Sequence, residues 1–410
     1  MKDYPSPASF IFNRLFIGGM TLMPLLGVIL PRFMAFAPLL LALLGIGVFF
    51  TSARENHKKF IKSPLIICGA IMALAGFSVL WALNPEISGD RAGKLALILL
   101  PGALLLAFTA LPPHKAMRDF AWVFPWAVIA AAMLLTIELY CKAPLYHAIR
   151  GVEIPEEFNL SNLNRASVCI LLSLPLAAFF VCASGFSRER TAIMLGLLTM
   201  ALLAILYQTA SQSVQLAFIV FVLFWAAFPT RFQPAWIALA ILIALAVIAA
   251  PWVSQLAFKE LAENFHHAPW LQNGYAAERL EIWDYVGRYA LQHPFHGFGI
   301  EATRAVEAFD TAEIYQKGVT ILHPHNFALQ LWIEFGLLGV LPAAALAGFL
   351  LYRLAALPTT MSRLGVGVFT ACLSIAATGY GLWQSWWIGE IILIMLFFMF
   401  ALRFYREKNS

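Results

Sequence analysis

Twelve long runs of apolar residues constrain the fold of this chain more than any other feature of its sequence. Each run is close to the roughly 20 residues that a helix needs to cross a bilayer. The runs cover residues 12–30, 33–50, 64–83, 94–111, 119–139, 166–184, 191–207, 213–229, 234–250, 326–351, 364–381 and 387–404. Charged residues make up only 12% of the 410 positions, against about 25% in soluble domains. The sequence therefore predicts an all-α, polytopic membrane protein with about twelve transmembrane helices.

The positively charged residues are distributed unevenly between the connections of these runs. Sixteen of the 27 Lys and Arg residues fall at the two termini and in one alternate set of connections. Lys and Arg concentrate on the cytoplasmic side of a membrane, so both termini are predicted to be cytoplasmic and the longest connection to face outward. This topology also explains the net charge of +5, and no nucleic-acid partner is predicted.

Three regions follow from the same pattern. Residues 1–250 hold the first nine predicted helices, residues 251–325 an outer loop domain, and residues 326–410 the last three helices. No predicted span carries a chain of Asp, Glu or Lys residues, which usually marks an ion or proton pathway. A transporter is therefore the weaker interpretation.

The outer loop contains a stretch, "YAAERLEIWDYVGRYALQH", with the pattern of an amphipathic helix. Its apolar residues at helical spacing are Leu280, Trp283, Val286, Ala290 and Leu291. The following "HPFHGFG" predicts a tight turn, because Pro and Gly interrupt the helix.

Two arginines on this predicted helix have different surroundings. Arg288 follows Asp284 by four residues, which predicts an ordinary surface ion pair. Arg279 has no acidic residue three or four positions away. It is therefore a candidate anion-binding residue, with contact to lipid headgroups or pairing with a remote acid as the alternatives.

Other basic residues on the outer side raise the same question. Arg91 and Lys94 lie three apart at the start of one run, and Arg165 opens another in "NLNRAS". Each can bind an anion or extend toward lipid headgroups. Asp90 and Glu86 are also close enough in sequence to neutralise Arg91.

Two histidines flank a proline in "ILHPHNFALQLWIEFGLLGV". Pro324 suits the entry to a helix, which places His325 at the outer N-terminus of the tenth run. The helix dipole there disfavours the imidazolium ion, and a neutral imidazole is what a general base requires. The alternative is a polar cap at the membrane interface. His323 has the weaker case as a base, and a simple surface contact is its alternative.

The remaining histidines and the cysteines show no compact ligand spacing. His266, His267, His293 and His296 form no HExxH motif, and the five cysteines form no CxxC motif. We therefore predict no metal and no cofactor. An outward site with several cations and one base suits a substrate that carries a diphosphate on a lipid tail.

The stretch "HNFALQLWIEFGLLG", residues 325–339, has His-Asn, nine residues and then Gly-x-x-Gly. It resembles the signature of bacterial O-antigen ligases and of the wider ligase and polymerase superfamily. The layout is also similar, with about twelve spans and a large outer loop between the ninth and tenth. The resemblance implies a GT-C-like glycosyltransferase of the bacterial inner membrane with a periplasmic active site.

The resemblance also implies substrates and site residues. The donor would be O-antigen polysaccharide on undecaprenyl diphosphate, and the acceptor a sugar hydroxyl of lipid A-core. His325 would deprotonate that hydroxyl, and Arg279 would hold the diphosphate, in an inverting reaction without metal. His323, Asn326 and Lys94 are possible supporting residues.

One position departs from the pattern. Many relatives carry an arginine after a serine in the outer loop between the seventh and eighth spans, where this chain has Gln212 in "TASQSVQL". Gln212 can hydrogen-bond a phosphate oxygen but adds no charge. Arg165 is the preferred replacement and Arg91 the second choice.

Several other functions fit the same sequence. An O-antigen polymerase uses the same donor with a second lipid-linked glycan as acceptor, and a protein O-oligosaccharyltransferase modifies Ser or Thr hydroxyls. A lipid-linked glycan flippase or a scaffold without activity would not need His325.

Overall fold

A computed structural model describes residues 7–51, 61–109, 112–151, 158–265, 268, 276–306 and 321–409. Every regular element in these ranges is a helix, which confirms the predicted all-α class. The contacts divide the chain into two compact units. Unit 1 comprises Met1–Gly69, Leu97–Phe218 and Ser385–Ser410, and unit 2 comprises Ala70–Ala96 and Ile219–Gln384. The predicted division at residues 250 and 325 is a different, linear one and stays a prediction.

Unit 1 packs its helices around an aromatic centre. Its helices are α1 Pro7–Ile29, η1 Pro31–Ala35, α2 Ala37–Thr51, α5 His114–Tyr140, α6 Pro144–Arg150, η4 Leu160–Leu163, α7 Asn164–Ala183, α8 Arg188–Gln208 and α18 Ser385–Asn409. Phe120 and Phe124 of α5 stack with ring centroids 4.8 Å apart. Phe397 of α18 lies 4.7 Å from Phe124, and Phe180 of α7 lies 5.4 Å from Phe120. Offset and edge contacts of this kind add to the hydrophobic gain from burial.

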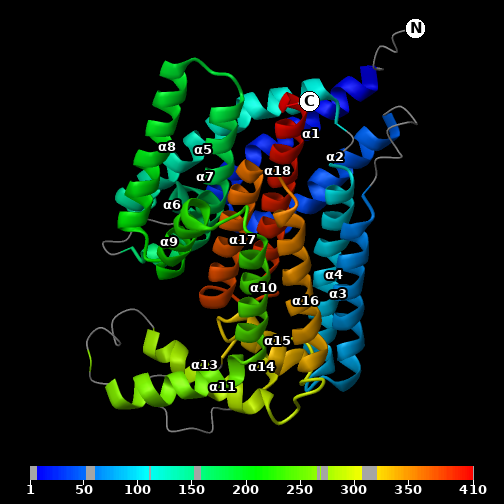
Figure 1. Cartoon of the computed structure of the whole chain (residues 1–410), viewed down its shortest axis with the longest axis vertical. Coiled ribbons are helices and arrows are strands. Elements are labelled where there is room, and N and C mark those ends of the chain that lie inside the picture. Colours follow the sequence, from blue (N-terminus) through cyan, green and yellow to red (C-terminus); the bar gives the residue numbers. More distant parts are fainter. Residues whose placement is uncertain are drawn as a thin grey trace. The chain divides into compact units, whose positions relative to one another are not determined.

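Unit 2 contains a bundle of longer helices and a group of shorter ones. Its helices are α10 Gln233–Ile248, α11 Ala250–Ala257, the π-helix η5 Phe258–Glu263, α13 Ala276–Ala290, α14 Ala302–Ala305, α15 Phe327–Phe335, α16 Leu337–Ala355 and α17 Thr359–Thr378. α10 packs against α16, and α11 packs against α13 (Figure 1). The Trp332 indole on α15 donates to the Val247 carbonyl at 2.9 Å, which ties α15 to the end of α10.

Three helices and one short 3₁₀ turn remain. η3 Val79–Trp81 lies within unit 2, whereas α3 Ser63–Ser78, α4 Pro85–Ala107 and α9 Gln212–Ala227 each have residues in both units.

All twelve predicted runs are helical. Among the described residues, eight helices are long and apolar enough to cross a membrane, and α10 with α11 makes a ninth that is bent by 69°. The three other runs fall short of that test: α2 and α9 have only 15 and 16 residues, and α4 begins with the charged residues Glu86, Asp90, Arg91 and Lys94. The polytopic class is confirmed, with eight or nine spans by length and composition.

The predicted tenth run, residues 326–351, is two helices rather than one. Gly336 has φ +55° and separates α15 from α16. The amides of Leu337 and Leu338 leave the helical ladder and donate to the carbonyls of Pro294 and Phe295 at 2.9 and 3.1 Å. A glycine tolerates this left-handed conformation without steric cost. The sequence pattern missed the break because both halves are equally apolar.

The predicted "HPFHGFG" turn is confirmed and closes the end of α15. Gly297 and Gly299 have φ +63° and +85°. The amides of Phe298 and Gly299 donate to the carbonyls of Ile333 and Glu334, both at 2.8 Å. The last carbonyls of a helix have no partner within it, so this turn supplies the partners from another segment of unit 2.

Candidate active site

Helix α13 is anchored to the segment that carries the histidine pair. It forms over Ala276–Ala290, as predicted, and Val286 and Ala290 lie on its buried face. The Trp283 indole donates to the Pro324 carbonyl at 2.7 Å. Arg279 lies one turn before Trp283, and residues four apart share a helix face. Arg279 therefore lies on the face of α13 that meets residues 323–325.

Arg279 and His325 are close enough to influence each other. The positive charge of Arg279 contributes to the lowered pKa of His325. Burial lowers the pKa of the Arg279 guanidinium, against the opposing effects of Tyr380 and Glu278. No ion pair among the described residues involves Arg279. By contrast, Arg288 pairs with Asp284 at 2.5 Å, as predicted.

His325 has a defined orientation and tautomer. Its Nδ1 lies 2.7 Å from the Gly379 carbonyl oxygen. A carbonyl only accepts hydrogen bonds, so Nδ1 carries the proton and Nε2 keeps its lone pair. Burial and the Arg279 charge lower the pKa of His325, and the bond to Gly379 partly opposes them. The ring is therefore neutral near pH 7.

The cause of this neutrality differs from the prediction. The helix starts at Phe327, with Asn326 as its N-cap, whose side-chain oxygen accepts from the amides of Ala328 and Leu329 at 3.0 and 3.3 Å. Pro324 and His325 therefore lie just before the helix, at its entry. Burial, rather than the helix dipole, is the first cause of the lowered pKa. Asn326 supports the site by capping α15.

His323 is packed into the same region, so it does more than contact the surface. Its ring centroid lies 4.2 Å from that of His325. Gln384 donates its side-chain amide to Nε2 of His323 at 2.8 Å. Burial lowers the pKa of His323 to about 3, helped by His325, Arg304 and Arg91. His323 is therefore neutral and accepts hydrogen bonds.

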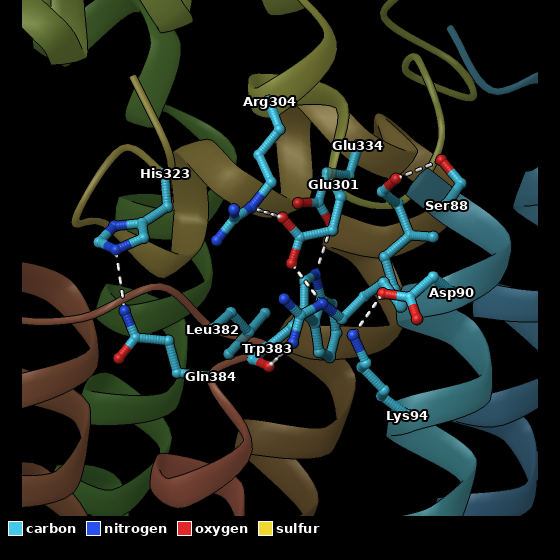
Figure 2. A network of polar contacts seen from close by, with 12 residues as sticks. Ser88, Asp90, Lys94, Glu301, Arg304, His323, Glu334, Leu382, Trp383 and Gln384 are labelled. Atoms are coloured by element: carbon cyan, nitrogen blue, oxygen red, sulfur yellow. Dashed lines mark hydrogen bonds and ion pairs between the residues drawn. The ribbon is translucent and has the colours of Figure 1, made fainter. Parts of the chain in front are cut away.

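Arg91 belongs to a charge network in unit 2 (Figure 2). Its Nε pairs with Glu301 Oε1 at 2.5 Å, and its Nη1 donates to the Trp383 carbonyl at 3.0 Å. The second oxygen of Glu301 pairs with Arg304 Nε at 2.6 Å. Asp90 binds Lys94 instead, at 2.6 Å on the exposed side. The local neutralisation of Arg91 by Asp90 is therefore wrong.

Sequence analysis missed Glu301 and Arg304. Glu301 is 6% exposed and has φ +62°, unusual for a residue other than glycine. The charge of this glutamate offsets one of its two arginines. No local spacing indicates the pair with Arg91, because the two residues come from distant parts of the sequence.

A second buried carboxyl, Glu334, lies on α15 and is fully buried. Gln330, one turn earlier, donates to Glu334 Oε1 at 2.9 Å, and the Trp383 indole donates to Oε2. Sequence analysis placed this carboxyl in an apolar span and did not select it.

Arg165 and Gln212 lie in unit 1 and are described there by themselves. Arg165 lies over the Trp386 ring, 5.8 Å from its centroid. Gln212 is exposed at the start of α9. The Thr209 hydroxyl donates to Ser167 at 3.3 Å and accepts from the Ser211 amide at 3.2 Å. These bonds join the first turn of α7, which holds Arg165, to the connection that precedes Gln212.

Among the described residues, no three His, Cys, Asp or Glu side chains are grouped so that they could hold a metal ion. His293 and His296 instead pack against Phe298 and Trp81. His266 and His267 lie outside the described residues.

These features define a polytopic helical membrane protein in which unit 2 joins a neutral histidine, an arginine and a buried acid network. Residues 195–344, which include Arg279 and His325, match the family described as O-antigen ligase. The resemblance seen in the His-Asn motif is thus confirmed over these residues.

Rickettsia proteins described as candidate polysaccharide ligases are also similar. The chain is 26% identical to one from Rickettsia conorii over 278 residues, which cover 66% of this chain and 64% of that protein. It is 31% identical to one from Rickettsia prowazekii over 128 residues, 30% of this chain and 32% of that protein. The chain thus spans less than two thirds of these relatives.

Proposed function

We propose that this protein is an inverting, metal-independent glycosyltransferase. It moves O-antigen polysaccharide from undecaprenyl diphosphate to a sugar hydroxyl of lipid A-core, at the periplasmic face of the bacterial inner membrane. One observation carries this proposal: the Gly379 carbonyl holds His325 with Nε2 available as a base, beside the charge of Arg279.

The reaction follows from these two groups. His325 Nε2 takes the proton of the acceptor hydroxyl as its oxygen attacks the anomeric carbon of the donor. The bond from that carbon to the diphosphate breaks, and the diphosphate leaves with the electron pair. Arg279 binds the departing oxygens, where negative charge develops. One displacement inverts the anomeric centre, and the energy comes from the sugar–diphosphate bond.

The other cations are ranked by what already neutralises them. Arg91 shares the charge of Glu301 with Arg304 and holds the Trp383 carbonyl, so its first role is structural. Lys94 pairs with Asp90 in the exposed part of α4. Arg165 is the preferred partner for the donor diphosphate in place of Gln212, because the two residues occupy neighbouring helix starts in unit 1. An Arg165→Ala protein with full transfer activity would remove this assignment.

The test uses a strain that lacks this gene and accumulates its lipid-linked O-antigen. It is complemented with wild type, His325→Ala or the control His114→Ala, whose side chain is 78% exposed in unit 1. Lipopolysaccharide gels and membrane immunoblots report product and expression. We expect long capped chains with wild type and the control, and uncapped core with donor of normal length in His325→Ala. The transfer rate of His325→Ala should fall about 10²–10⁴-fold, which is the typical contribution of general base catalysis.

Other outcomes separate the alternatives. Single-repeat caps in the gene-deficient strain would identify a polymerase, and loss of glycan on proteins an O-oligosaccharyltransferase. A well-expressed His325→Ala protein that restores the full ladder would contradict the transferase and favour a flippase or a scaffold.

A further inference from the structure

The connection between α17 and α18, residues 379–384, is fixed by unit 2 side chains at five points (Figure 2 shows Leu382, Trp383 and Gln384). Two of the contacts involve the histidine pair: Gly379 O with His325 Nδ1 and Gln384 with His323. Gln330 Oε1 accepts from the Leu382 amide at 2.7 Å. Glu334 accepts from the Trp383 indole, and Arg91 donates to the Trp383 carbonyl.

Hydrogen-bond polarity fixes the orientation of Gln330. A backbone amide only donates, so the Gln330 oxygen must face Leu382. Its nitrogen then faces Glu334, to which it donates at 2.9 Å. Gln330 is 2% exposed and Glu334 is fully buried, so water does not replace these bonds. Three hydrogen bonds thus form one continuous series from the Leu382 amide through Gln330 and Glu334 to the Trp383 indole. Each donor in this series has one acceptor.

Glu334 has only donors around it. Gln330 and the Trp383 indole both donate to its carboxyl group. A glutamine at 334 would present an NH₂ group to one of these donors. Turning Gln330 to suit it would bring a second NH₂ group against the Leu382 amide. The site therefore requires a carboxyl at 334 and an amide at 330.

The same connection carries the atom that sets the tautomer of His325. Gly379 lies three residues before Leu382, and its carbonyl is the partner of His325 Nδ1. We infer that Gln330 and Glu334 are positioning residues, which hold residues 379–384 so that the Gly379 carbonyl keeps His325 in the Nδ1–H form. This inference rests on the proposed role of His325 as the base.

Several charged or titratable groups surround the histidine pair. Arg279 on α13 acts on His325, and Tyr380 in the connection acts on Arg279. Arg304 and Arg91 act on His323, as does His325. The bond to Gly379 raises the pKa of His325, so weakening that bond lowers it further.

The main test is Gln330→Leu, which interrupts this series of hydrogen bonds without changing the charge of the protein. Glu334→Gln cuts it with almost no change of volume, and Trp383→Phe removes one donor if the other variants fold poorly. The matched control is Glu138→Gln: Glu138 is a buried carboxyl in unit 1 that accepts from the amides of Leu145 and Tyr146. This control variant measures how losing a buried acceptor in another part of the protein affects the same readouts.

Two readouts are made on full-length protein in detergent. The first is the transfer rate per folded protein as a function of pH. The second is the pH dependence of diethyl pyrocarbonate modification at His325, measured by peptide mass spectrometry, which needs no enzymatic activity.

In the three network variants, we expect transfer to fall on the order of 10-fold. The midpoint of His325 modification should move about half to one pH unit lower, whereas Glu138→Gln leaves it unchanged. A folded Gln330→Leu or Trp383→Phe protein with the wild-type midpoint would overturn the inference, even if its rate fell. A shifted midpoint in a protein whose wild type transfers no glycan would uphold the positioning and reject the proposed function.

Discussion

The centre of unit 1 and the site of unit 2 are both buried, and they are held together in different ways. In unit 1, Phe120, Phe124, Phe180 and Phe397 pack ring against ring. Such packing is non-directional and tolerates exchange of one apolar side chain for another of similar volume. In unit 2, Gln330, Glu334 and Trp383 bond through donors and acceptors that cannot be exchanged. The first region gives stability, and the second gives orientation.

The largest expected effect is on the free energy of unfolding, and it tests the role of the aromatic centre of unit 1. Phe124→Ala removes a fully buried ring and should lower the free energy of unfolding by about 3–5 kcal/mol. Denaturant unfolding in detergent measures it, and the transfer rate per folded protein should stay at the wild-type value. Trp126→Ala on the same helix is the control, because Trp126 is 46% exposed. Equal losses for both variants would contradict the packing argument.

Arg279→Ala tests the other region of the comparison, the candidate site of unit 2. Transfer should fall on the order of 10²-fold because the leaving diphosphate loses a charged donor, while the unfolding curve changes little. Arg279→Lys should recover only part of the rate, since lysine lacks the planar fork. Arg288→Ala on the same helix serves as the control. A normal rate in Arg279→Ala would show that this arginine contacts lipid headgroups instead.

The pH dependence of stability gives a smaller effect. The folded chain holds the pKa of His323 at about 3, below the ordinary histidine value of 6.5. As the pH falls from 6.5 toward 3, the unfolded chain binds a proton that the folded chain does not, so stability decreases. A His323→Gln protein should show a shallower decrease than wild type in unfolding experiments across this range. Parallel curves would mean that His323 is protonated in the folded protein.

The smallest effect is expected at Lys94. Its side chain is 55% exposed and pairs with an equally exposed Asp90, and such pairs contribute about 0–1 kcal/mol. Lys94→Ala should lower the free energy of unfolding by no more than about 1 kcal/mol. The transfer rate should change by less than about 3-fold. Loss of transfer comparable to that of Arg279→Ala would instead assign Lys94 to the substrate.

Local patterns predicted a large part of the fold. The apolar runs identified every long helix, and the spacing of Asp284 and Arg288 gave their ion pair. The glycines of "HPFHGFG" gave the turn. Each of these features depends on residues within a few positions of one another, which is the range over which a single sequence is informative.

The rest of the site depends on contacts between distant segments. Nothing near Arg91 indicates Glu301, and nothing near His325 indicates the Gly379 carbonyl. Glu334 lies among apolar neighbours in the sequence. Its two carboxyl oxygens accept hydrogen bonds from Gln330 and Trp383, and Trp383 comes close to Glu334 only in the folded protein. The sequence therefore selected His325 and Arg279 as candidates, and could not indicate the contacts that surround them.

The backbone of His325 has a practical consequence. Its φ of +54° lies in the left-handed region, which costs roughly 1–2 kcal/mol for a residue with a Cβ and nothing for glycine. A His325→Gly protein would relax this strain and leave a vacancy of the size of one imidazole ring beside the Gly379 carbonyl. Free imidazole added to the medium could occupy it and restore the missing base, so that a small diffusible molecule would switch transfer on and off.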